Sequence, residues 1–179
     1  MLPKFKYHPN PIATGSIEQA ENVCECCGLA RGYIYMGPVH AAQNLDKALC
    51  PWCIADGSAH KKFRADFIRL DGIGGFGEWD DVPEEVLKEV AHCTPGFCGW
   101  KPERWWTHCG DAAEYLGPAG WKEVLRFGDE LMAALKADTG FEGAEWKEYF
   151  ESLDLNRGPT AYVFRCIHCG KLGGYSDYR

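Results

Sequence analysis

Cys24-Glu25-Cys26-Cys27-Gly28 and Cys50-Pro51-Trp52-Cys53 are the two stretches around which this chain is organised. Each contains a Cys-x-x-Cys pair, and two such pairs at this separation are typical of four thiolates on one structural zinc ion. Tetrahedral Zn²⁺ prefers soft ligands about 2.3 Å away, and a two-residue spacer lets one tight turn supply two of them. We therefore predict a structural zinc site whose closed shell leaves no position for water or substrate, formed by Cys24, Cys27, Cys50 and Cys53.

The residues around these pairs predict a small zinc-binding lobe at residues 20–70. Gly28 suits the sharp turn after the first pair, and residues 31–37 have the β-branched and aromatic character of a strand. Pro51 is well placed as the first residue of a helix. A knuckle, a hairpin and a helix in this order are typical of a treble clef, and a zinc ribbon is the alternative. Cys26 lies between ligands and is expected to be a packed thiol.

The rest of the chain predicts a helical, Trp-rich region at residues 82–179, so that 1–179 is one α+β domain. Apolar residues at helical spacing predict helices from about 82 to 93, from Gly117-Pro118 to about 137 and from 144 to 153. Residues 160–165 are expected to form a strand. Residues 72–77 match the Gly-x-Gly-x-x-Gly pattern, but no strand–turn–helix context surrounds them, so we expect a loop without a dinucleotide cofactor.

A second zinc site is predicted around the C-terminal knuckle Cys166-Ile167-His168-Cys169-Gly170. One Cys-x-x-Cys pair cannot complete a tetrahedron, so ligands from elsewhere are required. Cys109 is the first choice because it precedes a Gly-Asp turn, and the fourth ligand is left open between His108 and Cys98. The residues considered are Cys93, Cys98, His108 and Cys109, with His92 and His168 behind them. A reduced pair without metal is the alternative.

The second site also carries the one enzymatic hypothesis that the sequence supports. If a water molecule were one ligand, the metal would make it acidic enough to react near neutral pH. His108, with Asp111 or Glu114, would then be the candidate base. The chain has no Ser-His-Asp or phosphate-loop signature for another chemistry, so no catalytic residue is assigned.

Composition restricts the remaining classes of function. The net charge of −7 argues against nucleic-acid binding through bulk electrostatics, although Lys61, Lys62, Arg64 and Arg69 form a local basic set. No apolar run approaches the roughly 18 residues of a membrane span, and no signal peptide is visible at Met1. Cys-x-x-Cys pairs in such a chain indicate metal sites in a reducing cytoplasm rather than disulfides.

Short motifs distributed over nearly the whole chain resemble those of the bacterial CbrC family. They are Phe5-x-Tyr7-His8-Pro9-x-Pro11, Cys24-x-Cys26-Cys27-Gly28, Cys50-Pro51-Trp52-Cys53-Ile54-Ala55-x-Gly57, Thr94-Pro95-Gly96-Phe97-x-Gly99-Trp100, His108-Cys109-Gly110-Asp111 and Cys166-x-His168-Cys169-Gly170. The resemblance implies a cytoplasmic bacterial protein without established activity, linked to colicin tolerance and to control by a two-component system. It implies no catalytic residues. We expect a zinc-binding protein with an adaptor role towards a protein partner in colicin tolerance or envelope stress.

Overall fold

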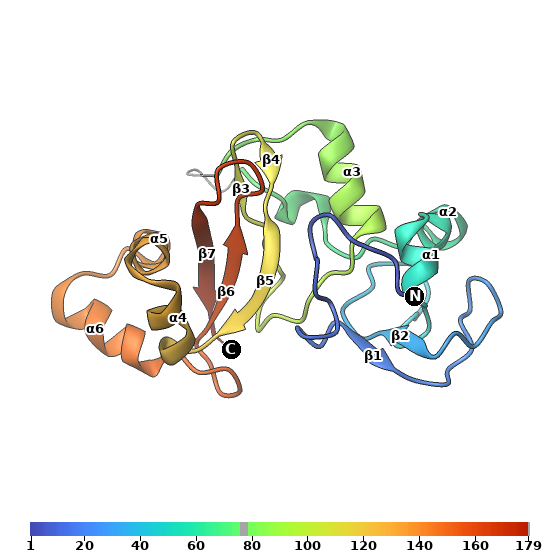
Figure 1. Cartoon of the computed structure of the whole chain (residues 1–179), viewed down its shortest axis with the longest axis horizontal. Helices are drawn as coiled ribbons and strands as arrows, with labels where there is room; N and C mark the ends of the chain where they lie inside the picture. Colours follow the sequence, from blue (N-terminus) through green and yellow to red (C-terminus); the bar gives the residue numbers. More distant parts are fainter. Residues whose placement is uncertain (76–78, 179) are drawn as a thin grey trace.

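The computed structural model describes residues 1–75 and 79–178, and within these the chain is a mixed α/β protein. Figure 1 shows three parts in a row, which are an N-terminal lobe, a central sheet and a group of C-terminal helices. The N-terminal lobe contains strands β1 (Ile17–Gln19) and β2 (Tyr33–Tyr35) and helices α1 (Pro51–Ala55) and α2 (Ser58–Phe63). The 3₁₀ helix η1 (Leu70–Gly72) and helix α3 (Glu84–Cys93) lead from it to the sheet.

Helix boundaries in this half follow local chemistry. Pro51 is the first residue of α1, where its fixed φ suits the helix and its missing N–H is not needed. Helix α3 begins directly after Pro83, and Glu84 and Glu85 lie in its first turn, where negative charge favours the helix dipole. It ends at Thr94, which is extended and precedes a proline. The predicted helix starts at Cys50–Pro51 and near residue 82 thus agree closely with the structure.

The central sheet is antiparallel, with strand order β5-β6-β7. Its strands are β5 (Glu114–Ala119), β6 (Thr160–Arg165) and β7 (Leu172–Asp177), while β3 (Thr107–His108) and β4 (Asp111–Ala112) form a separate hairpin. Alternate residues of β6 pack into two different hydrophobic cores. Tyr162 and Phe164 belong to an aromatic cluster that includes Trp105, and Ala161 and Val163 pack with the C-terminal helices. Both faces of β6 are therefore covered.

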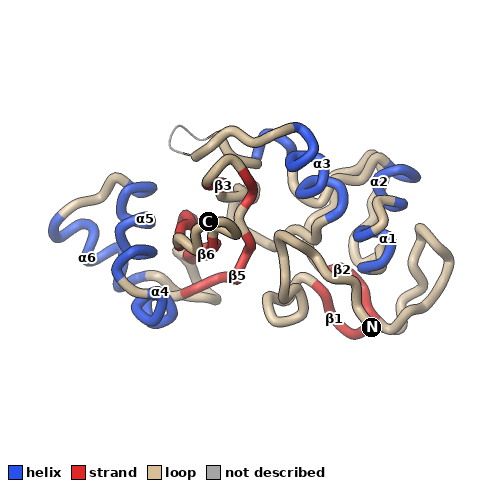
Figure 2. The backbone as a smooth tube through the Cα atoms, turned by 45° about the horizontal axis from the view of Figure 1, so that its top comes forward, coloured by secondary structure: helices blue, strands red, loops and turns tan. Residues whose placement is uncertain are grey.

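The C-terminal helices are α4 (Trp121–Phe127), α5 (Asp129–Thr139) and α6 (Gly143–Ser152). They lie together on one side of the sheet, away from the N-terminal lobe, in both ribbon views (Figures 1 and 2). Leu131 and Leu135 of α5 are fully buried there with Val124 of α4. Residues 144–153, predicted as helical, correspond to α6 within one residue at each end.

One helix prediction is wrong, and residues 82–179 are less helical than expected. Residues 117–119 belong to strand β5, and the expected helix is divided into α4 and α5 at Gly128, whose φ is 93°. Gly117 and Pro118 pair with β6 through a shift of register after Tyr115, a contact with residues far along the chain. The glycine-rich loop predicted at 72–77 ends outside the described residues.

Candidate metal centres

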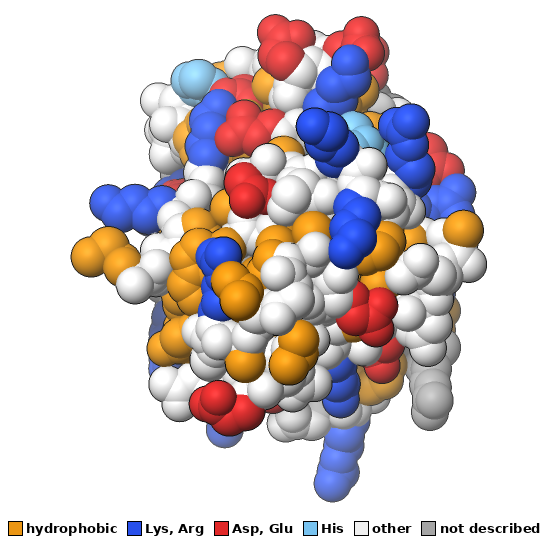
Figure 3. Space-filling model, turned by 90° about the vertical axis from the view of Figure 1, so that its right-hand side faces the viewer, with side chains coloured by type: hydrophobic (Ala, Val, Ile, Leu, Met, Phe, Trp, Pro, Cys, Tyr) orange, Lys and Arg blue, Asp and Glu red, His pale blue; other side chains and the backbone are white. Residues whose placement is uncertain are grey.

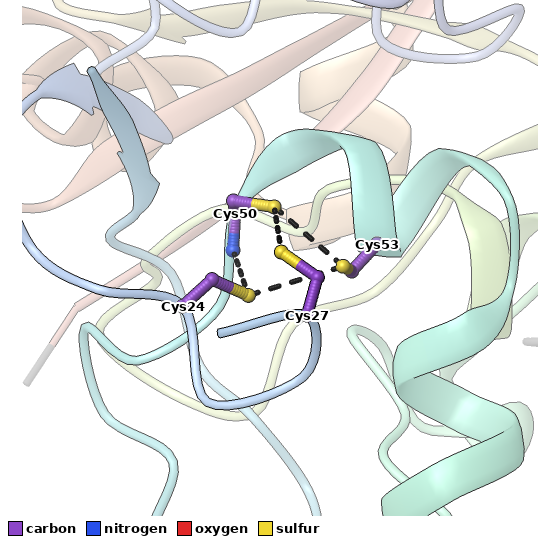
Figure 4. Close-up of side chains that lie close together, drawn as sticks. All are labelled: Cys24, Cys27, Cys50 and Cys53. Atoms are coloured by element: carbon purple, nitrogen blue, oxygen red, sulfur yellow. Dashed lines mark hydrogen bonds between the residues drawn. The ribbon is translucent and has the colours of Figure 1, made fainter. Parts of the chain in front are cut away.

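The first candidate centre lies in the N-terminal lobe, where the structure brings together Cys24, Cys27, Cys50 and Cys53. Cys24 and Cys27 come from the loop between β1 and β2, Cys50 immediately precedes α1 and Cys53 lies within it. Figure 4 shows the four sulfur atoms pointing toward a common centre. Three of these cysteines are buried and Cys27 is half-buried, so the centre forms part of the core of the lobe.

The sulfur spacing in this centre fits a tetrahedral metal ion. The Sγ–Sγ distances are 3.9 Å for Cys24–Cys53, 3.9 Å for Cys27–Cys50 and 3.6 Å for Cys50–Cys53. Ligands about 2.3 Å from a tetrahedral zinc lie about 3.8 Å apart, whereas disulfide sulfurs lie about 2.05 Å apart. All ten cysteines are free thiols. The four cysteines therefore fit the zinc ion that the sequence predicts at this position.

Backbone hydrogen bonds shape the first knuckle. The amide N–H of Gly28 donates to the carbonyl oxygen of Cys24 at 2.7 Å, and the amide of Cys24 donates to Leu29 at 3.0 Å. Gly28 has a φ of 73°, which explains why glycine follows the second cysteine. Lys62 of α2 donates to the carbonyl oxygens of Glu25 and Cys26, so a cation also supports the turn.

Cys26 does not belong to the first centre. Its Sγ lies 3.5 Å from the hydroxyl oxygen of Ser58, and the side chain is half-buried against the same core. This placement agrees with a packed thiol between two potential ligands. The position therefore offers a natural control for cysteine substitutions.

The second candidate centre joins two turns at one end of the sheet and contains His108, Cys109, Cys166 and Cys169. The β3–β4 hairpin supplies the first two, and the turn between β6 and β7 supplies the others. Nδ1 of His108 lies 3.2 Å from Sγ of Cys109 and 3.5 Å from Sγ of Cys169, and the two sulfurs are 3.9 Å apart. These separations again fit donors on one tetrahedral ion.

The turn at Cys166–Gly170 repeats the geometry of the first knuckle. The amide of Gly170 donates to the carbonyl oxygen of Cys166 at 3.0 Å, and the amide of Cys166 donates to Lys171 at 2.8 Å. Gly170 has a φ of 76°. In the facing hairpin, Cys109 and Gly110 have φ values of 58° and 68°, which give the tight two-residue turn. The second centre is thus built from the ends of two hairpins.

Other residues considered for the fourth ligand lie elsewhere. Sγ of Cys98 is 3.8 Å from the carbonyl oxygen of Met36, and Cys93 approaches the Gly57 turn of the N-terminal lobe. His168 is not one of the four donors of the second centre, and its Nε2 lies 2.9 Å from the carboxylate of Asp111. His92 belongs to a different cluster. Of the two residues left open by the sequence, His108 is the one that the structure places beside Cys109.

A hydrogen-bond network around Asp111 adjoins the second centre, because Asp111 pairs with His108 across the β3–β4 hairpin. Asp111 accepts hydrogen bonds from the hydroxyl of Tyr7 at 2.7 Å and from the ammonium of Lys6 at 3.3 Å, in addition to its contact with His168. The ring of His108 stacks on Trp106 with centroids 5.3 Å apart. No local sequence pattern indicates these supporting roles, because they depend on contacts between segments that are distant in the sequence.

Backbone amides favour the thiolate form at the first cysteine of each knuckle. Burial opposes ionisation of Cys24, but the N–H groups of Cys27, Cys50 and Cys26 lower its pKa to about 7. Burial also opposes ionisation of Cys166, but the N–H groups of Cys169 and His168 lower its pKa to about 6. The thiolate is the metal-binding form, and the backbone of each turn favours it at one cysteine of the cluster, Cys24 in the first and Cys166 in the second.

The residues named as candidate bases have other contacts. Asp111 is held by Tyr7, Lys6 and His168, and Glu114 forms an ion pair with Arg165. A surface hollow of about 660 Å³ lies away from both cysteine clusters. Its lining includes Arg69, Asp71, Lys101, Glu103, Arg104 and Asp177. Neither cysteine cluster therefore opens into this hollow.

The amino-acid sequence is similar to those of proteins without an assigned activity. The family model described as "Uncharacterised protein family (UPF0167)" matches residues 2–178. The UPF0167 proteins Mb2317 of Mycobacterium bovis and MT2352 of Mycobacterium tuberculosis are each 47% identical over 179 residues, covering 99% of this chain and 94% of their own. UPF0167 protein PA1536 of Pseudomonas aeruginosa is 39% identical over 171 residues, covering 95% and 93%. No solved structure matches the chain.

Proposed function

We propose that this chain, which belongs to the UPF0167 family of uncharacterised proteins, is a zinc-stabilised binding protein in which two zinc ions have structural roles. The observation that carries the proposal is that each cysteine cluster already contains four donor atoms. A tetrahedral ion with four protein ligands has no free position for water or substrate. Structural zinc sites have this closed form, whereas catalytic sites keep one position open.

The donor atoms favour zinc over other common ions. Thiolates and imidazole are soft or borderline ligands that suit zinc in tetrahedral geometry, while magnesium and calcium prefer oxygen. When bound, zinc would supply a covalent-like cross-link between segments that are distant in the sequence. In the first centre the cysteines hold the β1–β2 loop against α1, and in the second they hold two hairpins together.

The alternative of a metal-dependent hydrolase has less support. It requires a water ligand at the second centre, and His108 stands in the fourth donor position there. It also requires a free base, and both Asp111 and Glu114 already have charged or hydrogen-bonding partners. A chelator-sensitive hydrolytic activity that disappears in a folded Cys109→Ala variant would favour this alternative over our proposal.

Binding of nucleic acid by the N-terminal lobe also has less support. Lys62 is occupied with the carbonyl oxygens of the knuckle, and Arg69 forms an ion pair with Asp71 at 2.7 Å. Figure 3 looks onto this end of the molecule, where Lys and Arg side chains are interspersed with acidic and apolar ones rather than forming a continuous basic surface. Binding to a nucleic-acid duplex that weakens steeply with salt would overturn this judgement.

We propose that the protein is cytoplasmic, as its resemblance to the CbrC family implies, and that it acts as an adaptor for a protein partner. A role in colicin tolerance or envelope stress is part of the same proposal and rests on that resemblance alone. Within residues 1–75 and 79–178, no helix combines the length and apolar character that a membrane crossing needs. We therefore propose no membrane insertion.

Native mass spectrometry with thermal unfolding tests the structural role of zinc. The wild-type chain is expected to carry two zinc ions, and Cys24→Ser and Cys109→Ser are each expected to carry one. Loss of the first centre should lower the midpoint of unfolding by about 10 °C, because losing a structural metal costs several kcal/mol. Cys26→Ser and Cys98→Ser are matched controls that should retain both ions. Unchanged zinc content and unfolding midpoint in Cys24→Ser would refute the proposal.

A further inference from the structure

A third cluster of metal-binding side chains lies between the N-terminal lobe and α3, apart from both cysteine centres. It contains His60 of α2, Asp66 of the following loop and His92 in the last turn of α3. Nδ1 of His60 is 3.0 Å from Oδ1 of Asp66, and Nε2 of His92 is 3.4 Å from the same oxygen. One donor atom from each residue lies within 4.8 Å of the others.

Two of the three separations between donor atoms fit neighbouring ligands on one ion. Imidazole nitrogens and carboxylate oxygens bind first-row divalent metals at about 2.0–2.2 Å. Two ligands at that distance lie about 3.0 Å apart when they subtend a right angle and about 3.4 Å apart at the tetrahedral angle. The two measured separations between nitrogen and oxygen therefore correspond to neighbouring positions around an ion.

The backbone holds the carboxylate in place independently of any ion. The amide of Asp66 donates to the carbonyl oxygen of His40 at 3.0 Å, and the amide of His40 donates to Asp66 at 2.8 Å. The next residue, Phe67, donates to the carbonyl oxygen of Ala91 at 2.7 Å, which fixes the loop beside His92. Arg64, with a φ of 54°, ends α2 and turns the chain back toward α3. The three donors are thus positioned by separate, hydrogen-bonded elements.

Hydrogen bonding between the side chains is the competing explanation. The carbonyl oxygen of Ala65 also lies 3.2 Å from Nδ1 of His60, so this nitrogen has two acceptors beside it. The two imidazole rings are stacked, with centroids 3.5 Å apart and planes 16° apart. An ion must lie close to the plane of each imidazole that binds it, so binding requires the rings to tilt toward each other at their donor ends. The two explanations thus predict different ring arrangements when metal is added.

We propose that His60, Asp66 and His92 form a third metal site, which takes a divalent first-row transition ion through two imidazoles and one carboxylate. Its donors differ from those of the cysteine centres, because nitrogen and oxygen ligands suit manganese, iron, cobalt and nickel as well as zinc. Three protein ligands also leave positions for water or a further ligand, as in catalytic and exchangeable metal sites. The three side chains are 26%, 27% and 15% exposed, so solvent reaches the site.

Cobalt(II) added to the zinc-loaded protein is the probe, after native mass spectrometry has established how much zinc the cysteines hold. We expect one cobalt ion per chain, with d–d absorption but without the sulfur-to-cobalt charge-transfer bands that thiolate ligands give. Asp66→Asn and His92→Gln should each weaken cobalt binding by at least about 10-fold, because each removes a direct ligand. His40→Gln is the matched control, since the two hydrogen bonds that join His40 to Asp66 are between backbone groups, which the substitution keeps.

Ring resonances give a readout that does not depend on protein stability. Cobalt bound to the donor nitrogens of both rings should shift the imidazole protons of His60 and His92 and leave those of His8 nearly unchanged. Binding that is equal in wild type, Asp66→Asn and His92→Gln would overturn the proposal. So would the appearance of thiolate bands with a matching release of zinc, because the added ion would then occupy a cysteine centre. No uptake of cobalt by folded wild type that carries two zinc ions, one for each cysteine centre, would establish the hydrogen-bonded cluster instead.

Discussion

His8 is a buried titratable residue that belongs to none of the three metal clusters. Its side chain is inaccessible to solvent and lies edge-on to Tyr115, with ring centroids 5.1 Å apart. Nδ1 is 2.7 Å from the carbonyl oxygen of Pro95, which can only accept, so this nitrogen carries the proton. Nε2 then accepts from the hydroxyl of Thr14 at 2.7 Å. Burial lowers the pKa of His8 to about 4, against a smaller opposing effect of the Pro95 carbonyl.

We predict that His8 makes the folded state sensitive to mild acid. Its pKa is lower when folded than the usual value of 6.5, so the unfolded chain binds the proton more readily. The free energy of unfolding should therefore fall as the pH drops below about 6.5, with a loss of about 2 kcal/mol by about pH 5 and no further loss below about pH 4. Denaturant unfolding of wild type and His8→Gln at both ends of this range measures the difference.

The His8→Gln comparison separates this effect from acid release of metal. The wild-type free energy should fall more steeply with pH than that of the variant, while zinc content at each pH stays equal in the two proteins. Parallel pH profiles would show that His8 does not carry the acid sensitivity. A steeper profile in His8→Gln would contradict the direction of the pKa shift.

At the scale of elements, the segment after α3 passes close to the loop that follows α2. A Cβ added to Gly96 would collide with the backbone carbonyl oxygen of Phe67 and would lie 3.0 Å from the hydroxyl oxygen of Tyr35. Because Phe67 is also bonded to α3 through Ala91, its carbonyl has little room to move. Gly96 is required here for close approach of two backbones.

Gly96→Ala is accordingly expected to destabilise the protein by about 1–3 kcal/mol, the usual cost of overpacking a core. Gly120→Ala is the comparison, because a Cβ there would lie 3.1 Å from the carboxylate of Glu123 and 3.2 Å from the carbonyl oxygen of Leu153, both looser contacts than the one with Phe67 at Gly96. Chemical denaturation of both variants measures the free energies. Equal stability of Gly96→Ala and wild type would show that the Phe67 loop moves without cost.

Local sequence patterns predicted the elements whose causes are local. Residues 160–165 form β6 as expected, and Pro51 begins α1, since strand composition and proline geometry act over a few residues. The prediction that a helix begins at Gly117-Pro118 is wrong, because these residues pair with β6. Their partners in β6 lie more than forty positions away in the sequence. Apolar spacing at Val124 and Leu131 was genuine, but it did not reveal the break at Gly128.

The candidate centres show the same division between local and distant causes. Each Cys-x-x-Cys-Gly knuckle is a local motif, and both knuckles adopt the turn that this spacing predicts. The choice between His108 and Cys98 required the position of the β3–β4 hairpin relative to β6 and β7, which no local pattern contains. The cluster of His60, Asp66 and His92 gave no motif at all, because its members are single residues on three elements.

At the scale of the whole molecule, the two cysteine centres differ in their access to solvent. Cys24, Cys50 and Cys53 are at most 3% exposed and form part of the core of the N-terminal lobe. In the second centre, Cys109 and Cys169 are exposed at the end of the sheet, and Cys166 alone among its sulfurs is buried. A chelator takes a metal by replacing its ligands one at a time, so it must first reach them.

The difference in access predicts stepwise removal of zinc by a chelator. One zinc per chain should be lost quickly from the second centre and the other slowly from the first, because slow loss requires the N-terminal lobe to open. Release followed with a colorimetric zinc indicator should show two phases in wild type, and Cys109→Ser should lack the fast phase. During the fast phase, the backbone amides of the β3–β4 hairpin and the β6–β7 turn should lose their protection from hydrogen exchange. The amides of β2 and α1 should remain protected. A single phase in wild type, or a fast phase that persists in Cys109→Ser, would contradict this assignment, since burial would then not control the order in which the centres lose their metal.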